Sequence, residues 1–239
     1  MSDDAAHAWL LDQQPFDDAD SEAQLRGLLA VLGSAPKRVL DLGCGVGRVL
    51  LPLVRAGHEV VGIDREPTLL ESCAESLADE GLKAKLLEGD FLGRWPAKLG
   101  RFDAICCLGN TFVTVWDVDI AIEFLEVVVA HLEPGGAFVL DDLPHEYWPE
   151  LIEGNWLSGI SEDGQSQLVW ASHDAVFTIR HGDAVDPKCW TIRASDTPLR
   201  LWTSGALRLA ARLAGLSGPH CQAESKLLIM PLAGKRPRT

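Results

Sequence analysis

The chain has 239 residues and an ordinary globular composition, with 47% apolar and 23% charged residues. Its formal net charge of −14 argues against a nucleic-acid substrate, because a protein that grips phosphates needs a basic face. The sequence has no membrane-length apolar run, no signal peptide at its first residues and no C-x-x-C pair among its six cysteines. We therefore expect one cytoplasmic α/β domain without a membrane partner, a structural metal or a disulfide framework.

Strands and helices alternate regularly over the first 140 residues. Ser21 and Gln24 have the spacing of a capping box, which predicts a helix from there to about Leu32. Predicted strands follow at 37–42, 59–63, 83–87, 102–108 and 137–140, with predicted helices at 46–56, 67–81 and 120–132. Continuous apolar strands that alternate with helices predict a parallel sheet covered on both faces.

The pattern changes after residue 145. Short segments at 168–170, 175–180 and 189–194 are typical of antiparallel strands, and a helix at 204–214 precedes a closing strand at 226–231. Five of the eight tryptophans lie in this part of the chain, where they either line a substrate pocket or form the insertion's own core. They are Trp148, Trp156, Trp170, Trp190 and Trp202.

Three glycines, Gly43, Gly45 and Gly47, form a loop between the first predicted strand and the next helix. Without Cβ atoms such a loop lets a nucleotide-like ligand lie against bare backbone, and the following helix N-terminus offers free N–H groups. A dinucleotide fingerprint would read G-x-G-x-x-G, but Arg48 stands where its third glycine is expected. The loop therefore favours a nucleotide-like ligand other than a nicotinamide dinucleotide.

Five motifs in this order and spacing resemble those of the class I S-adenosylmethionine-dependent methyltransferases. They occupy 41–47, 61–64, 88–91, 102–110 and 132–136, so the resemblance covers about residues 36–142. It implies an α/β fold with a doubly wound, mostly parallel, seven-stranded Rossmann-like sheet, and a small antiparallel insertion after the fifth strand. We divide this single domain, 1–239, into an N-terminal cap (1–35), a cofactor core (36–145), a substrate cap (146–202) and a final helix and strand (203–239).

The resemblance also implies residues that bind S-adenosylmethionine and its product, S-adenosylhomocysteine. Asp64 ends the second strand about 20 residues after Gly43, the position at which an acid is expected to accept ribose hydroxyls. The alternative is that Asp64 only caps the next helix. Asp90 is expected to accept the adenine amino group, or else to form a turn. The predicted donor-binding residues are Asp41, Gly43, Cys44, Gly45, Asp64, Arg65, Asp90, Phe91 and Leu108.

Candidates for acceptor binding follow the fourth and fifth strands, because ligands bind at the carboxyl edge of such sheets. His145 is the candidate base or orienting group, Asp142 the candidate for holding an amine, and Asn110 a further orienting residue. The alternative is that these side chains form only local hydrogen bonds. Adjacent acids also suit Mg²⁺, but no third ligand stands out, so we predict no metal.

Methyl transfer from a sulfonium is a direct displacement, so the protein chiefly has to align the reacting atoms. We expect the protein to transfer a methyl group to a nitrogen or oxygen atom of a small molecule. Segment 108–111 resembles the corresponding segment of glycine-type and aminosugar N-methyltransferases, which favours nitrogen as the acceptor atom. Alternatives are a non-catalytic donor-binding protein, a protein methyltransferase and an NAD(P)-linked oxidoreductase. His7 and Trp9 are candidates for an N-terminal lid over the donor.

Overall fold

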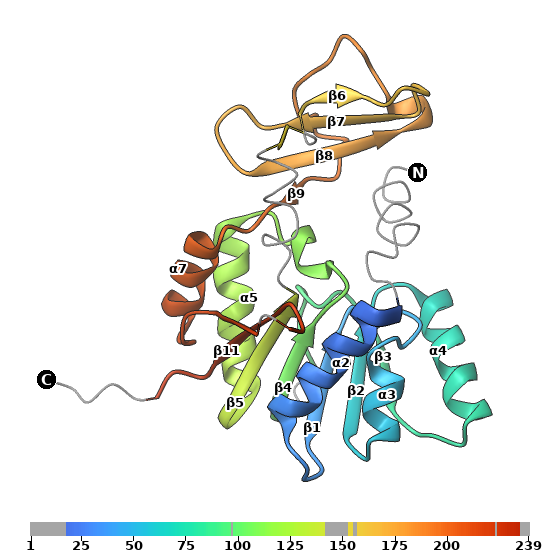
Figure 1. Ribbon diagram of the computed structural model, residues 1–239, viewed down its shortest axis with the longest axis vertical. Coiled ribbons are helices and arrows are strands. Elements are labelled where there is room, and N and C mark those ends of the chain that lie inside the picture. The colour runs from blue at the N-terminus through green and yellow to red at the C-terminus, as the bar shows by residue number, and fades with distance from the viewer. Residues whose placement is uncertain (1–17, 97, 142–152, 155–156, 223, 235–239) are drawn as a thin grey trace, which may run out of the picture.

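A computed structural model of the chain describes residues 18–96, 98–141, 153–154, 157–222 and 224–234. A seven-stranded sheet runs through it in the order β10-β11-β5-β4-β1-β2-β3 (Figure 1). Strands β1 to β5 pair in parallel, whereas β11 pairs antiparallel with β5 and with β10. The strands are β1 (Arg38–Leu42), β2 (Glu59–Asp64), β3 (Lys85–Glu88), β4 (Phe102–Cys107), β5 (Leu132–Asp141), β10 (His220–Gln222) and β11 (Leu227–Pro231).

Helices cover both faces of this sheet, so the predicted fold class is confirmed. Helices α2 (Asp18–Leu32), α3 (Leu50–Arg55) and α4 (Pro67–Asp79) pack in one core layer, and α5 (Val118–His131) and α7 (Ser204–Ala214) pack in the other. Neighbouring strand residues alternate between the two layers, as Cys106 and Cys107 do, and both thiols are free and fully buried. None of the described helices is both long and apolar enough to cross a membrane.

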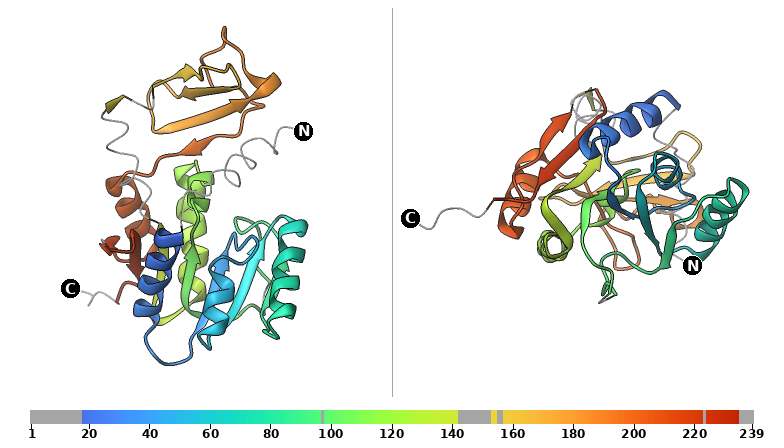
Figure 2. Two further views of the ribbon diagram at one scale, coloured as in Figure 1. Left: turned by 45° about the vertical axis from the view of Figure 1, so that its right-hand side comes forward. Right: turned by 90° about the horizontal axis from the view of Figure 1, so that it is seen from below.

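The insertion forms a second, smaller sheet in the order β6-β7-β8-β9, with antiparallel pairing throughout. Its strands are β6 (Gly159–Ile160), β7 (Ser166–Trp170), β8 (Val176–His181) and β9 (Leu199–Arg200). Phe177 and Leu199 pack on Val113 of a short 3-10 helix, η1 (Thr111–Thr114), which follows β4. Figures 1 and 2 show the small sheet above the edge at which β1 to β5 end. The predicted antiparallel insertion is therefore confirmed.

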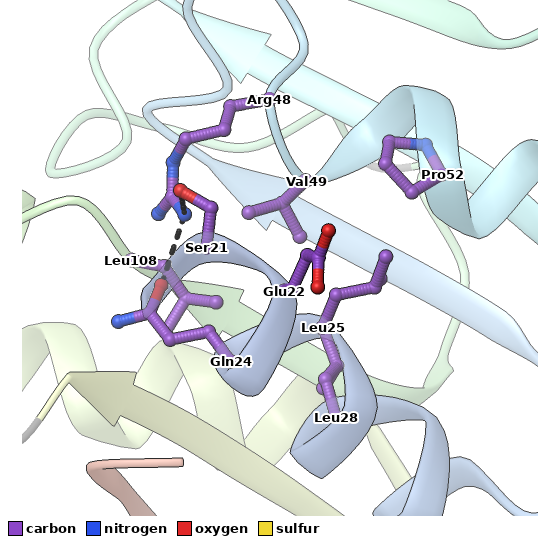
Figure 3. A pocket seen from close by; sticks show the side chains of 9 residues that line it. All are labelled: Ser21, Glu22, Gln24, Leu25, Leu28, Arg48, Val49, Pro52 and Leu108. Carbon is purple, nitrogen blue, oxygen red and sulfur yellow. Dashed lines mark hydrogen bonds between the residues drawn. The ribbon is translucent and has the colours of Figure 1, made fainter. Parts of the chain in front are cut away.

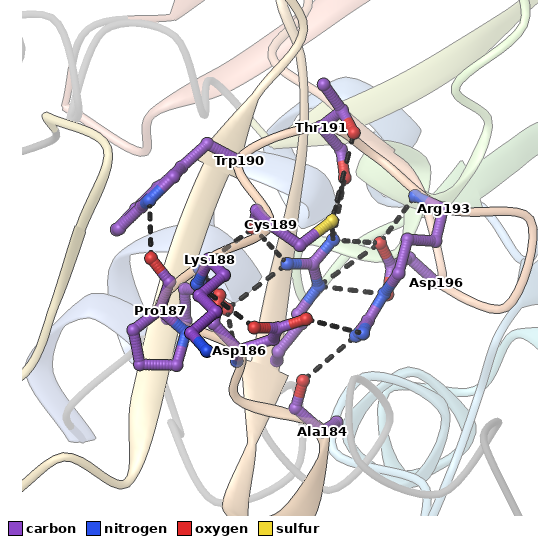
Figure 4. Close-up of polar contacts among 11 residues, drawn as sticks. Ala184, Asp186, Pro187, Lys188, Cys189, Trp190, Thr191, Arg193 and Asp196 are labelled. Atoms are coloured by element: carbon purple, nitrogen blue, oxygen red, sulfur yellow. Dashed lines mark hydrogen bonds and ion pairs between the residues drawn. The ribbon is translucent and has the colours of Figure 1, made fainter.

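The prediction of a strand at 189–194 is wrong, because this segment contains no strand. The small sheet is completed by β6 and β9 instead. The carbonyl oxygens of Cys189 and Thr191 accept hydrogen bonds of 2.7 Å from the Arg180 guanidinium rather than from a neighbouring strand. The same guanidinium binds Asp196 at 2.7 Å (Figure 4). A buried arginine thus holds this segment as a loop.

The capping box is also wrong, because α2 begins at Asp18 and Ser21 therefore lies within the helix. The helix predicted from residue 46 begins at Leu50, since the glycine loop has left-handed backbone as far as Gly47. The short strand β10 was not among the predicted elements. These shifts leave the order of the main elements unchanged.

Candidate functional site

A cavity of about 370 Å³ lies at the carboxyl ends of β1, β2, β3 and β4. All nine residues predicted to bind the donor line it, and those positions come from four separate strand ends. They are Asp41, Gly43, Cys44, Gly45, Asp64, Arg65, Asp90, Phe91 and Leu108. The fold therefore gathers the predicted donor residues around one space, while their contact with a donor stays a prediction.

The glycine loop forms one wall of this cavity. Gly43 and Cys44 both donate their N–H groups to the Ile63 carbonyl, and Gly45 donates to the Asp64 carboxylate at 2.7 Å. Those three amides are therefore satisfied inside the protein. A Cβ on Gly45 would meet no atom within 4 Å, so at this point bare backbone faces open space.

Asp64 is 8% exposed and joins β2 to the glycine loop. One carboxylate oxygen accepts from Gly45 and the other accepts from the Glu66 N–H at 3.0 Å. Each carboxylate oxygen has a second lone pair, so the group can still accept a hydroxyl from the cavity. This geometry suits ribose binding and also explains why the loop keeps its shape.

The next strand end carries Asp90 and Phe91. The Asp90 carboxylate accepts the Leu92 N–H at 2.8 Å, which is the turn geometry given above as the alternative role. Phe91 is half-buried and packs edge-on against Phe124, with ring centroids 5.5 Å apart. Arg65 is exposed, and its Nε lies 3.5 Å from the Glu66 carboxylate. An aromatic edge and polar groups thus share this wall.

Asp41 is a buried carboxyl group in the wall of the cavity, with an exposed fraction of 3%. Burial raises its pKa to about 7, with Asp64 and Asp141 adding to the shift and Arg48 opposing it. Among the described residues its buried Oδ2 has no hydrogen-bond partner. A buried carboxylate that lacks a donor is suited to bind a cationic or N–H-bearing ligand group.

A second cavity of about 270 Å³ lies between α2 and the glycine loop (Figure 3). Arg48, Val49 and Leu108 line both cavities and so form the partition between them. Gln24 of α2 accepts from Arg48 at 3.0 Å and donates to Asp141 at 2.7 Å. Neither Gln24 nor Arg48 was a predicted site residue.

The predicted acceptor residues have mixed positions. Asn110 is 5% exposed, has left-handed backbone (φ 62°) and donates its N–H to Asp141, but it is not part of the described cavity lining. Asp142 and His145 lie outside the described residues, as do His7 and Trp9. Their roles in acceptor binding, catalysis or lid closure stay predictions.

The outer end of the cavity has residues that sequence reasoning missed, namely Thr114, Trp116, Thr197 and Pro198. Trp116 is 40% exposed, and its carbonyl accepts from Arg200 at 2.5 Å. These positions lie far apart in the chain, so no local sequence pattern signalled that they meet. Core and insertion together therefore line one cavity.

Three of the five insertion tryptophans are described, and none lines this cavity. Trp170 packs against Phe177 in the small sheet, and Trp202 packs against Phe112 in the main core. Trp190 is 42% exposed and donates to the Pro187 carbonyl. Of the two roles considered for these tryptophans, the insertion's own core describes Trp170, whereas Trp202 belongs to the main core.

Comparison with known proteins gives matches to methyltransferases. A family model described as a methyltransferase domain matches residues 39–136. The cypemycin N-terminal methyltransferase of a Streptomyces species is 35% identical over 105 residues, which cover 44% of this chain and 41% of that protein. The demethylmenaquinone methyltransferase of Thermus thermophilus is 35% identical over 128 residues, which cover 53% of this chain and 56% of that protein.

A solved S-adenosylmethionine-dependent methyltransferase from Clostridium acetobutylicum has the same fold over 97% of this chain and 99% of its own, with a TM-score of 0.68 and 16% identity. The chain spans about half the length of the two curated relatives above. Other curated relatives include ribosomal RNA methyltransferases from Shewanella sediminis and Alcanivorax borkumensis. The names of the relatives therefore agree on the reaction and differ in the acceptor.

Proposed function

We propose that the chain is a class I S-adenosylmethionine-dependent methyltransferase that transfers a methyl group to nitrogen or oxygen of a small-molecule acceptor. The observation that carries this proposal is the single cavity in which the predicted donor residues meet Trp116, Thr197 and Pro198 of its outer end. Its volume of about 370 Å³ falls within the range of about 300–1,000 Å³ typical of small-molecule sites.

The residues present fit the donor chemically. Asp41 offers a buried carboxylate oxygen without a partner among the described residues, which suits the ammonium of the donor's methionine part. The open space beside Gly45 admits a ligand against backbone, and Asp64 can accept ribose hydroxyls. Phe91 supplies an apolar edge for the adenine.

Methyl transfer requires the acceptor's lone pair to form a bond to the methyl carbon while the carbon–sulfur bond breaks. The electron pair stays on sulfur, S-adenosylhomocysteine leaves, and an N–H or O–H acceptor releases a proton. The donor supplies the activation through its sulfonium charge, so this chain has to align the atoms and exclude water. We assign alignment to Leu108 and the glycine loop, and proton removal or orientation to His145 with Asp142 and Asn110.

We assign segment 146–202 to acceptor binding, as a cap on the cofactor core. Thr197 and Pro198 of this segment and Trp116 of the core line the outer end of the cavity, which supports the assignment. A cavity of this size lined by both core and cap suits a small molecule better than a nucleic acid, and so does the net charge of −14. The resemblance of segment 108–111 to N-methyltransferases favours nitrogen.

The test is the affinity for S-adenosylhomocysteine, measured by titration calorimetry on the wild type and on Asp64→Ala. We expect the wild type to bind and the variant to lose about 1–3 kcal/mol of binding free energy, because ribose hydroxyls lose their acceptor and Gly45 loses its anchor. Asp79→Ala, an exposed position at the end of α4, is the matched control and should bind like the wild type.

Turnover separates the alternatives. Release of S-adenosylhomocysteine in the presence of a panel of amines and hydroxyl compounds supports the proposal, whereas methylation only of proteins in a lysate supports a protein methyltransferase. Donor binding without turnover on any acceptor would indicate a non-catalytic binding protein. Failure to bind either donor or product, together with thermal stabilisation by NADH, would overturn the proposal in favour of an oxidoreductase.

A further inference from the structure

We propose that Gln24 of α2 is a positioning residue that fixes two walls of the donor cavity relative to each other. The inference rests on the proposed function, because it concerns the same donor site. Its basis is a polar chain that runs from the exposed Arg48 of the glycine loop through the buried Gln24 to the buried Asp141 at the end of β5.

The chain of contacts is continuous. Arg48 Nη1 donates to Gln24 Oε1 at 3.0 Å, and Gln24 Nε2 donates to Asp141 Oδ2 at 2.7 Å. Asp141 in turn accepts the backbone N–H groups of Gly109 and Asn110 at 3.1 Å and 3.2 Å. Arg48 of the glycine loop and Gly109 of the loop after β4 both line the donor cavity, so one amide connects these two parts of its wall.

The chemistry of the amide explains why glutamine suits this position. It offers one acceptor to the guanidinium and one donor to the carboxylate, a combination that no charged or apolar side chain supplies. Gln24 is 2% exposed and Asp141 is 7% exposed, so water cannot readily replace the bond between them, whereas Arg48 at the other end of the chain is exposed. Gln24 therefore satisfies two charged groups without bringing a third charge into the core.

The loop after β4, whose backbone N–H groups donate to Asp141, has a backbone conformation that needs such contacts to hold it. Gly109 and Asn110 have φ values of 75° and 62°, and a left-handed backbone at a residue with a side chain is unfavourable unless its surroundings fix it. Leu108 and Gly109 of this loop line the donor cavity. Without Gln24, Asp141 keeps the two backbone donors but loses its tie to α2 and, through it, to Arg48.

The test is a double-mutant cycle on S-adenosylhomocysteine affinity, with Gln24→Leu, Asp141→Asn and the two combined. We expect each single variant to bind about tenfold more weakly and the double variant no more weakly than the weaker single, since both break one chain of contacts. Gln24→Glu keeps the shape but places a carboxylate beside Asp141, so it should also bind more weakly. Glu22→Gln, on an exposed side chain two residues away, is the control and should bind like the wild type.

Thermal midpoints measured in parallel distinguish positioning from stability alone. If Gln24→Leu melts earlier but binds S-adenosylhomocysteine as tightly as the wild type, the inference is wrong and the residue is merely structural. The inference would also be wrong if the fold-losses of S-adenosylhomocysteine affinity in the two single variants multiply in the double variant, because the two residues would then act independently. A wild-type protein that fails to bind S-adenosylhomocysteine would remove the proposed function itself, which is a separate outcome.

Discussion

The glycines of the donor loop have different physical reasons to be glycine, and that difference can be tested. Gly45 has φ 52° and open space where a Cβ would stand, whereas a Cβ on Gly47 would come within 2.7 Å of the Cys73 sulfur. We expect Gly47→Ala to lose about 1–3 kcal/mol of unfolding free energy through overpacking and added backbone strain. Gly45→Ala should lose about 1–2 kcal/mol from strain alone, yet bind S-adenosylhomocysteine far more weakly.

Urea unfolding and titration calorimetry on both variants separate the two effects. The interpretation fails if Gly47→Ala is as stable as the wild type. It also fails if Gly45→Ala binds normally, because the methyl group would then stand outside the space that the donor occupies.

The buried carboxylate of Asp41 should make donor binding depend on pH. Its pKa is about 7 in the folded protein, raised mainly by burial, with Asp64 and Asp141 adding to the shift and Arg48 opposing it. The ammonium of the donor requires the ionised carboxylate, so affinity for S-adenosylhomocysteine should rise as pH increases through about 7. Calorimetry between about pH 6 and about pH 8 should show this rise in the wild type and a flat profile in Asp41→Asn.

Stability should change in the opposite sense. Because the pKa of Asp41 in the folded protein lies above its ordinary value of 3.8, the folded state binds a proton more tightly than the unfolded state does. Asp41 therefore makes the ligand-free protein less stable as pH rises from about 4 to about 7. Asp41→Asn should therefore be more stable above pH 7, by up to about 4 kcal/mol, and lose that advantage below about pH 4. An unchanged midpoint at pH 8 would contradict the raised pKa.

For single residues, the sequence was most informative about the predicted donor positions, which lie at the ends of strands. The nine predicted donor positions line one cavity because each motif fixes a residue at the carboxyl end of its own strand. Gln24 was assigned to a capping box, and its contact with Asp141 across 117 positions has no local signature. The same limit applies to Trp116 and Pro198, which meet only in the folded chain.

Among the elements, the loop after β8 depends on one buried ion pair. The side chains of Arg180 and Asp196 are 1% and 4% exposed, and the guanidinium also holds the carbonyls of Cys189 and Thr191. Removal of one partner from a buried pair costs about 3–5 kcal/mol. We expect Arg180→Met to open this loop to trypsin, with cleavage after Lys188 detected by mass spectrometry.

The donor site should survive that change, because the donor residues lie on the strand ends of the main sheet. Affinity for S-adenosylhomocysteine should therefore stay close to that of the wild type. Arg55→Met, which breaks the exposed pair with Glu80, is the control and should resist trypsin as the wild type does. Loss of product binding together with loop cleavage would show that the loop is needed for the core to keep its shape.

This ion pair also explains where element prediction failed. Segment 189–194 has the composition of a strand, but a sequence pattern describes only residues that are close together in the chain. It gives no sign that the distant Arg180 guanidinium donates hydrogen bonds to the backbone carbonyls of this segment. Strands β1, β2, β4 and β11 of the main sheet were predictable because nearly all of their residues are buried and most of them are apolar. Short edge strands such as β6, β9 and β10 have only two or three residues and no such pattern.

For the molecule as a whole, the two sheets together define the site. The parallel sheet lines the cavity with its strand ends, and the small sheet packs on η1 through Val113, while Thr197 and Pro198 just before β9 line the cavity as well. Arg200 strengthens that junction by binding both Asp174 of the insertion and the Trp116 carbonyl of the core. The class of cofactor could be predicted from sequence motifs. The choice of acceptor depends instead on how the insertion packs against the core, which no local motif describes.

The net charge bears on that acceptor, since relatives of this chain include ribosomal RNA methyltransferases. A chain with 35 acidic and 21 basic residues repels a polyanion, and non-specific RNA binding arises mainly from phosphate neutralisation. We expect no binding of a fluorescent single-stranded RNA in anisotropy titrations into the micromolar range, even at about 0.05 M salt, where such binding is strongest. The measurement should be repeated with saturating S-adenosylhomocysteine, so that an RNA surface that forms only when the donor site is occupied is tested as well. Binding that weakens steeply with added salt would contradict the small-molecule acceptor and favour RNA, whereas turnover on small amines without any RNA binding would support it.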